Sequence, residues 1–203
     1  MTKIKICGLS RIEDIEAVNE AGPDFAGFII NYPKSPRSIS PELLAVLTGN
    51  LNQKIMPVGV FVDAPSSLVT DLVKKDLIRM IQLHGREDDD YIRLIREKAC
   101  CPVVKAFHIR TEEDLKTAMK SPADYILLDH GLGENGKQIN RELLKGVTRE
   151  YFLAGGIGIE NVREAVQELS PYAVDLNSKL ETDGHKDPAK IREAVWTIRT
   201  YDN

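Results

Sequence analysis

Hydrophobic runs rich in β-branched and aromatic residues recur along the chain at intervals of roughly 20 to 30 residues. Several are nearly continuous rather than alternating, which is typical of parallel strands covered on both faces. Between these runs, apolar positions follow helical spacing. The pattern therefore predicts eight strands separated by helices. The predicted strands are Lys3–Ile6, Phe25–Ile30, Ile55–Val62, Ile78–Leu83, Val103–Phe107, Tyr125–Leu128, Tyr151–Leu153 and Tyr172–Leu176.

The segments between the strands carry signals for the beginning and end of helices. In the first, Ile12, Ile15 and Val18 recur at helical spacing. Ser10 is expected to cap the beginning of this helix, and Gly22 stands where a helix commonly ends. Seven further helices are expected to begin near Ser40, Pro65, Arg86–Asp90, Thr111, Arg141, Glu160 and Asp187.

Eight strand–helix units in this chain correspond to roughly 25 residues per unit, which suits a compact closed (β/α)8 barrel. An open, doubly wound sheet of six strands is the alternative, but it leaves two hydrophobic runs unexplained. No linker or low-complexity stretch divides the chain. We therefore predict an α/β fold in which residues 1–203 form a single (β/α)8 barrel domain.

Polar and titratable residues gather at the carboxyl ends of the predicted strands. This is the end at which a barrel carries its active site. The loops at the opposite end contain turn residues with little chemistry. The strand-end groups are Cys7-Gly8, the segment 31–37, Asp63, His84-Gly85, His108, Asp129-His130, Gly155-Gly156 and the segment 175–178.

Composition excludes several classes of partner. The formal net charge is −4, so the basic surplus typical of proteins that bind nucleic acid or anionic membranes is missing. The longest apolar-leaning run, Ile55–Val62, is too short to span a bilayer, and the first residues are strand-like rather than a leader segment. Cys7, Cys100 and Cys101 form neither a disulfide framework nor a C-x-x-C metal pattern. We expect a cytoplasmic protein with no nucleic-acid or membrane partner.

Short motifs stand in a defined order along nearly the whole chain, and each of them is weak by itself. They are Lys5–Leu9, Gly27-Phe28, Ser35–Arg37, Pro57–Val62, Gln82–Gly85, Leu128-Asp129, Leu153–Ile157, Asn161-Val162, Asp175, Ser178, Glu181, Gly184 and Lys186-Asp187. As an ordered set at the strand ends, they are specific. With them the chain resembles the phosphoribosylanthranilate isomerase family of tryptophan biosynthesis.

The resemblance implies a barrel of the ribulose-phosphate-binding type that needs no cofactor and no metal. It also implies an Amadori rearrangement, in which N-(5-phosphoribosyl)anthranilate becomes 1-(2-carboxyphenylamino)-1-deoxyribulose 5-phosphate. Cys7 would be the general base and Asp129 the general acid. The residues that it places against the small phosphosugar substrate are Arg37 at the anthranilate carboxylate, Gly155, Gly156 and Ser178 at the phosphate, and Asp175.

The chemistry calls for these residue types independently. Opening the sugar ring needs an acid, and removing the proton from C2 needs a base, each within about 2.6–3.2 Å of its proton. Both groups must be tuned toward neutral pH, so we expect positive potential around Cys7 and burial around Asp129. The planar fork of Arg37 fits a carboxylate. Glycine at 155 and 156 lets backbone N–H groups approach an anion.

Each candidate also has a structural interpretation, which the ordered motifs disfavour. Cys7 would be a small buried hydrophobic residue, Asp129 a helix cap and Arg37 a solvated loop charge. For His84 we favour a structural role that orients its neighbours over direct contact with the substrate. The remaining histidines, expected at the surface or in loops, are His108, His130 and His185.

Two stretches depart from the pattern of the family. The loop at 131–141 lacks the usual Gly-Gly-Thr-Gly and Phe-Asp-Trp segments. Lys179 stands where the family carries glycine in the phosphate loop, and its side chain would either strain the turn or add charge beside the phosphate. A divergent phosphosugar-barrel enzyme and a non-catalytic phosphosugar-binding paralogue are therefore kept as alternatives. A monomer is favoured over a homodimer.

Overall fold

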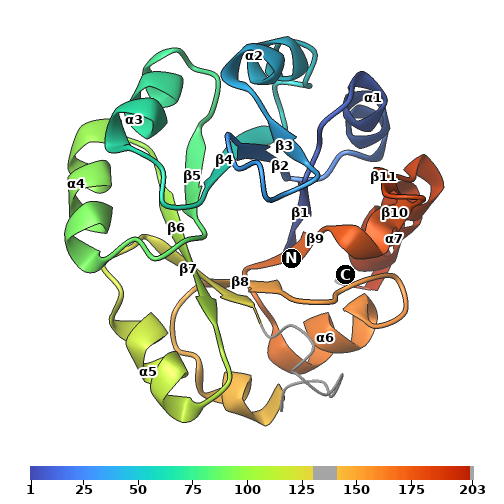
Figure 1. The fold of residues 1–203 in the computed structure, drawn as a ribbon. Helices are drawn as coiled ribbons and strands as arrows, with labels where there is room; N and C mark the ends of the chain where they lie inside the picture. The colour runs from blue at the N-terminus through green and yellow to red at the C-terminus, as the bar shows by residue number, and fades with distance from the viewer. Residues whose placement is uncertain (130–140, 202–203) are drawn as a thin grey trace.

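A computed structural model describes residues 1–129 and 141–201. Eight parallel strands form a ring with helices around it (Figure 1). Each overlaps one of the eight predicted strands. They are β1 (Lys3–Cys7), β2 (Phe25–Ile30), β4 (Met56–Phe61), β5 (Met80–Leu83), β6 (Val103–His108), β7 (Tyr125–Asp129), β8 (Tyr151–Ala154) and β9 (Ala173–Leu176).

The ring closes because β1 pairs with both β2 and β9. In the parallel register of β1 and β2, Cys7 lies opposite Gly27. In that of β1 and β9, Lys5 lies opposite Asp175. This closure confirms the predicted (β/α)8 barrel and rules out the open-sheet alternative.

Helices connect the strands and cover the outside of the ring (Figure 1). They are α1 (Ile12–Ala21), α2 (Pro41–Gly49), α3 (Ser66–Lys74), α4 (Asp89–Ala99), α5 (Glu112–Lys120), α6 (Val162–Leu169) and α7 (Pro188–Tyr201). The short helix expected near Arg141 is a 3-10 helix, η1 (Arg141–Gly146). Among the described residues, no helix has both the length and the apolar character needed to cross a membrane.

The first helix begins one residue later than predicted. Arg11, not Ser10, occupies the N-cap position of α1. The Asp14 carboxylate in the first turn accepts the backbone N–H groups of both Ser10 and Arg11, at 2.9 and 3.1 Å. Asp14 is the N3 residue of the helix, and its carboxylate thus satisfies the backbone N–H groups of the N-cap residue and of the residue before it, as the acidic residue of a capping box does. The predicted end at Gly22 is confirmed, with a left-handed φ of 68°.

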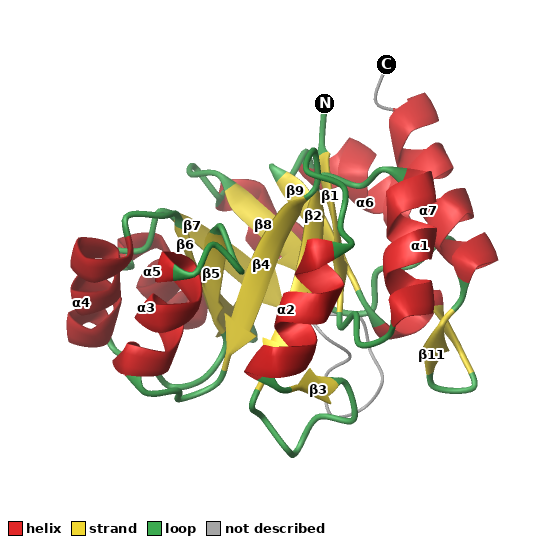
Figure 2. Cartoon of the chain, turned by 90° about the horizontal axis from the view of Figure 1, so that it is seen from above, coloured by secondary structure: helices red, strands yellow, loops and turns green. Residues whose placement is uncertain are grey.

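Three short strands were not predicted. They are β3 (Ser38–Ile39), which extends beside β2, and the antiparallel pair β10 (Glu181–Thr182) and β11 (His185–Lys186). Figure 2 shows β3 and β11 at the end of the barrel opposite to the N-terminus. These additions therefore lie at the carboxyl ends of the barrel strands, beside the site described below.

Alternation along the strands divides the core into two layers. Ile4 and Ile6 of β1 belong to the larger cluster between the ring and its helices, so Lys5 and Cys7 point into the ring. A second, smaller cluster of apolar side chains fills part of the interior of the ring. The interior cluster is Phe25, Val58, Met80, Val104, Leu127, Phe152, Ala154 and Ala173.

Candidate active site

A cavity of about 410 Å³ lies at the carboxyl ends of the barrel strands. Most of the predicted site residues line it, although they come from strands and loops that are far apart in the sequence. The predicted residues in its wall are Cys7, Asp129, Gly155, Gly156, Asp175 and Ser178. Its wall also includes Tyr32, Gln82, His84, Asn177 and Lys179.

Cys7 is the last residue of β1, and only 4% of it is exposed. Below it, the buried ammonium of Lys5 donates to both carboxylate oxygens of Asp175, each at 2.9 Å. Burial raises the pKa of the Cys7 thiol, and Asp175 raises it further, while Lys5 and Lys186 lower it. The two cations supply the positive potential expected around Cys7, but the net shift of the pKa is upward rather than toward neutral pH. The loss of hydration outweighs the attraction of the two cations.

Asp129 is the last residue of β7 and lies opposite His108 of β6 in the parallel register. Its carboxylate Oδ2 is 3.5 Å from Nδ1 of His108. The side chain of His108 is 69% exposed, as predicted for a surface residue. It nevertheless faces the candidate acid, which sequence reasoning did not anticipate.

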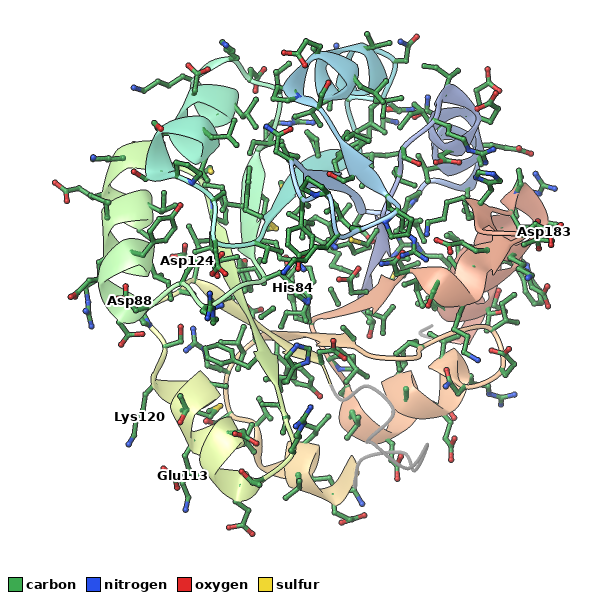
Figure 3. The ribbon with its side chains drawn as sticks, in the orientation of Figure 1. His84, Asp88, Glu113, Lys120, Asp124 and Asp183 are labelled. Atoms are coloured by element: carbon green, nitrogen blue, oxygen red, sulfur yellow. The ribbon has the colours of Figure 1, made fainter. Side chains whose placement is uncertain are left out.

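His84 follows β5 and projects toward the middle of the ring, whereas Asp88 and Glu113 lie at its periphery (Figure 3). Its Nδ1 is 2.9 Å from Nε2 of Gln82. Burial lowers the pKa of His84 and outweighs the opposing effects of Asp175 and Asp129. The imidazole is therefore neutral at pH 7 and can exchange hydrogen bonds with a ligand in the cavity.

His84, His108 and Asp129 are the described residues most suited to holding a metal ion. One ligand atom from each lies within 4.8 Å of the others. A tetrahedral zinc site, with bonds of about 2.0–2.2 Å, would bring these atoms to within about 3.5 Å of one another. Metal binding would thus require the three side chains to move closer together, and the metal ion would bind the carboxylate of Asp129. The observed spacing fits a contact between the side chains of His108 and Asp129 better than a metal site.

The loops after β8 and β9 meet at one side of the cavity. Gly155 and Gly156 have φ values of 98° and 68°. A Cβ at Gly156 would meet nothing within 4 Å, so backbone conformation rather than space requires glycine there. Gly158 follows in the same loop, and a Cβ there would lie 2.8 Å from Cβ of Lys179 on the facing loop after β9. The two loops are therefore in close contact.

Lys179 lies in the 3-10 turn η2 (Ser178–Leu180), and it is not among the residues with positive φ. The side chain of Lys179 therefore does not strain the turn, and the first of the two effects expected of this lysine is absent. Lys179 also lines the cavity and can place a positive charge there. Of the other departure, at 131–141, residues 131–140 lie outside the described residues, as does His130.

Arg37 binds a carboxylate, but that carboxylate belongs to the protein. Its Nε donates to Oε1 of Glu181 at 2.6 Å, and its Nη2 donates to Oε2 at 2.5 Å. Lys186 donates to the same carboxylate. Arg37 is not among the residues that line the cavity, and the interaction joins the segment before β3 to β10. Of the predicted site residues, Arg37 alone is placed outside the cavity wall.

Sequence reasoning assigned no role to Lys5, Gln82 or Lys186. The side chain of Lys186 is 1% exposed, and its ammonium also donates to Oδ1 of Asn177 at 2.9 Å. A signal for Lys5 was present, because a lysine between two buried isoleucines of a strand is rarely tolerated without a partner. No local pattern identifies that partner, which lies 170 residues away.

Comparison with known proteins shows the family. The family model for N-(5'-phosphoribosyl)anthranilate (PRA) isomerase matches residues 4–197. An N-(5'-phosphoribosyl)anthranilate isomerase from Endomicrobium trichonymphae is 41% identical over 204 residues, which cover 98% of this chain and all of that protein. A protein of the same name from Lachnoclostridium phytofermentans is 35% identical over 214 residues, which cover 96% of this chain and 97% of that protein.

Solved structures agree with the sequence comparisons. Phosphoribosyl anthranilate isomerase from Thermotoga maritima superimposes with a TM-score of 0.89 at 33% identity, over 98% of this chain and all of that one. A second isomerase structure, in complex with reduced 1-(o-carboxyphenylamino)-1-deoxyribulose 5-phosphate, has a TM-score of 0.85 at 32% identity with the same coverage. These matches confirm the resemblance found in the motifs. The chain therefore belongs to the family of N-(5'-phosphoribosyl)anthranilate isomerases, enzymes of tryptophan biosynthesis.

Proposed function

We propose that this chain converts N-(5-phosphoribosyl)anthranilate into 1-(2-carboxyphenylamino)-1-deoxyribulose 5-phosphate, with Asp129 as general acid and Cys7 as general base. The observation that carries the proposal is a single cavity at the carboxyl end of the barrel whose wall contains both groups. The solved family member with a reduced aminoketose phosphate bound supports the same class of ligand here.

The reaction is an internal oxidation–reduction. Asp129 protonates the ring oxygen, the bond from C1 to that oxygen breaks, and a protonated Schiff base forms between C1 and nitrogen. Cys7, as a thiolate, removes the proton from C2, and the electron pair moves through C1 to nitrogen to give an enolamine. Protonation at C1 and loss of the hydroxyl proton at C2 complete the ketone. C1 is reduced and C2 oxidised, so the balance needs no external electron carrier.

We assign the phosphate to the paired loops after β8 and β9. Gly155 and Gly156 adopt the left-handed backbone that turns N–H groups toward an anion, and α6 begins a few residues later with its N-terminus on that side. Ser178 and Lys179 line the cavity from the facing loop. Together they offer hydrogen-bond donors and one positive charge to the phosphate.

Arg37 is our candidate for the anthranilate carboxylate. Glu181 already engages its Nε and Nη2 atoms, so the substrate carboxylate binds the remaining N–H groups or displaces Glu181. Asp175, held against Lys5, lines the cavity and can accept a hydrogen bond from a sugar hydroxyl.

The loss of anthranilate-type fluorescence on incubation with phosphoribosylanthranilate tests the proposal. Wild-type protein is expected to turn over. Cys7→Ser and Asp129→Asn should each lower kcat by about 10²–10⁴-fold, as expected when a general base or acid is removed.

The exposed thiol of Cys100 supplies a matched control. Cys100→Ser should keep wild-type turnover. Unchanged rates in both active-site variants would overturn the assigned mechanism. An inactive wild type that still binds the phosphosugar would indicate the non-catalytic alternative instead.

We further propose a monomer located in the cytoplasm. Large exposed hydrophobic side chains are spread over separate helices, including Ile12 on α1, Val46 on α2 and Trp196 on α7, and scattered exposures of this kind need no partner. The cysteines are unpaired, which suits a reducing compartment. Light scattering should give a mass near 22.7 kDa, and twice that mass would overturn the monomer. Cell fractionation tests the location.

A further inference from the structure

Lys5 lies in the middle of a barrel strand, and its side chain is completely buried. Its ammonium binds both carboxylate oxygens of Asp175 inside the ring. Burial alone would lower the pKa of Lys5, but Asp175 and Cys7 more than compensate and raise it above its usual value. The group is therefore a cation at every pH at which the barrel works.

The ammonium of Lys5 and the thiol of Cys7 share one small space. The two residues are two positions apart on β1, so their side chains leave the strand on the same face. Gly27 of β2 lies opposite Cys7, and a Cβ there would be 2.9 Å from both Sγ of Cys7 and Nζ of Lys5. The glycine leaves room for both groups. An ammonium has three donors, so one remains for the sulfur after Asp175 is satisfied.

Other charges also face Cys7 from neighbouring elements, namely Asp175 on β9, Lys186 on β11 and Arg37 before β3. Lys5 lowers the pKa of Cys7 more than Lys186 does, while burial and Asp175 raise it. Without Lys5, a thiolate would stand beside the Asp175 carboxylate in a water-poor interior. Lys5 is therefore the cation on which the charged form of Cys7 depends most.

We propose that Lys5 is a positioning residue of the isomerisation, whose buried ammonium, held by Asp175, stabilises the thiolate of Cys7 that removes the C2 proton. The proposal rests on the function assigned to Cys7 above. A second buried pair provides the comparison that isolates this role. Lys105 binds Glu87 at 3.0 Å with side chains 6% and 2% exposed, but it points away from the ring interior and lies between β6 and the loop after β5.

Titration of the Cys7 thiol tests the interaction without relying on catalysis. In a Cys100→Ser/Cys101→Ser background Cys7 is the remaining thiol, so ultraviolet absorbance of the thiolate reports its midpoint directly. Lys5→Met should raise that midpoint by about 1–3 pH units, the size expected for losing one close opposite charge. The double variant Lys5→Met/Asp175→Asn has no unpaired carboxylate beside Cys7, so it should raise the Cys7 midpoint by less than Lys5→Met does.

Lys105→Met is the matched control. It removes a lysine from an equally buried pair and should lower thermal stability while leaving the Cys7 midpoint unchanged. A Cys7 midpoint that stays in place in both Lys5→Met and the double variant would overturn the proposal.

The pH dependence of kcat/KM gives the readout for the reaction. Its acid limb, where the thiolate forms, should move to higher pH in Lys5→Met by the same amount as the thiol midpoint, with the loss expressed in kcat rather than KM. Lys5→Arg keeps the positive charge, so its acid limb should lie closer to that of the wild type than the acid limb of Lys5→Met does. A midpoint that moves while the acid limb stays in place would overturn the role of Lys5 in the reaction. Full activity of Cys7→Ser would instead contradict the proposed function, and the thiol titration still decides whether Lys5 acts on Cys7.

Discussion

Gly27 lies opposite Cys7 in the register of β1 and β2, and it has no side chain to fill the space between the strands. A Cβ at this position would be 2.9 Å from Sγ of Cys7 and 3.1 Å from its Cα. The backbone atom cannot move aside as the end of a flexible side chain can. We expect Gly27→Ala to lower the free energy of unfolding by about 1–3 kcal/mol and to reduce turnover. Urea unfolding and steady-state kinetics measure the two effects.

Gly49 is a matched control for that substitution. It is the last residue of α2, a Cβ there would meet nothing within 4 Å, and its φ is not positive. Gly49→Ala should leave turnover unchanged and raise stability by about 0.4–1 kcal/mol, because alanine restricts the unfolded chain. Equal destabilisation by both substitutions would contradict the importance of close packing at Gly27.

At the scale of elements, the beginning of α4 shows how one side chain defines a boundary. The carboxylate of Asp88 accepts the backbone N–H of Tyr91 at 2.8 Å. Asp88→Ala should therefore cost about 1 kcal/mol of the free energy of unfolding, measured by chemical denaturation. Asp90 lies in the same turn, is 92% exposed and pairs at the surface with Arg93, so Asp90→Ala should cost less than about 0.5 kcal/mol. A larger loss for Asp90→Ala would contradict the capping role of Asp88.

The elements that the sequence predicted and those that it missed differ in kind. The barrel strands carry long hydrophobic runs, and most helices begin at capping residues, so local patterns were sufficient. β3, β10 and β11 have two residues each and no periodicity to detect. β3 forms where the chain returns beside β2. β10 and β11 are joined by the two-residue turn Asp183-Gly184, in which both residues have positive φ, and this local hairpin signal was not used in the prediction.

At the scale of the whole molecule, ion pairs between the two ends of the chain reinforce the closed ring. Arg37 binds Glu181 across 144 residues, and Arg199 binds Asp24 across 175. Lys186 strengthens the first of these by donating to the same carboxylate. The first and last units of the barrel are thus connected by charge as well as by the pairing of β1 with β9.

These contacts make stability depend on pH through Glu181. Burial would raise the pKa of Glu181, but hydrogen bonds from Arg37 and Lys186 lower it to about 2. The folded value lies below the unfolded value of about 4.3, so the stabilisation is complete above that pH and is lost as the pH falls toward 2. Glu181→Gln should lower the free energy of unfolding at pH 7 by about 1.5–3 kcal/mol and flatten its decline between about pH 5 and 2.

Asp71 provides the comparison, because its pair with Lys75 on α3 is exposed on both sides. Asp71→Asn should leave the dependence of stability on pH close to that of wild type. Unfolding curves recorded across this pH range decide the matter. A Glu181→Gln curve that runs parallel to the wild-type curve would rule out the assigned contribution.

The sequence by itself determined the order of strands and helices and the residue types at the strand ends, because hydrophobic periodicity, caps and motifs are local properties. It thereby identified the barrel and brought Cys7, Asp129 and the glycine loop to one end of it. Only the tertiary structure decided that Arg37 meets Glu181, that His108 faces Asp129, and that burial raises the pKa of Cys7. These features depend on charged groups distant in the chain meeting where water is scarce, and ring closure sets their distances.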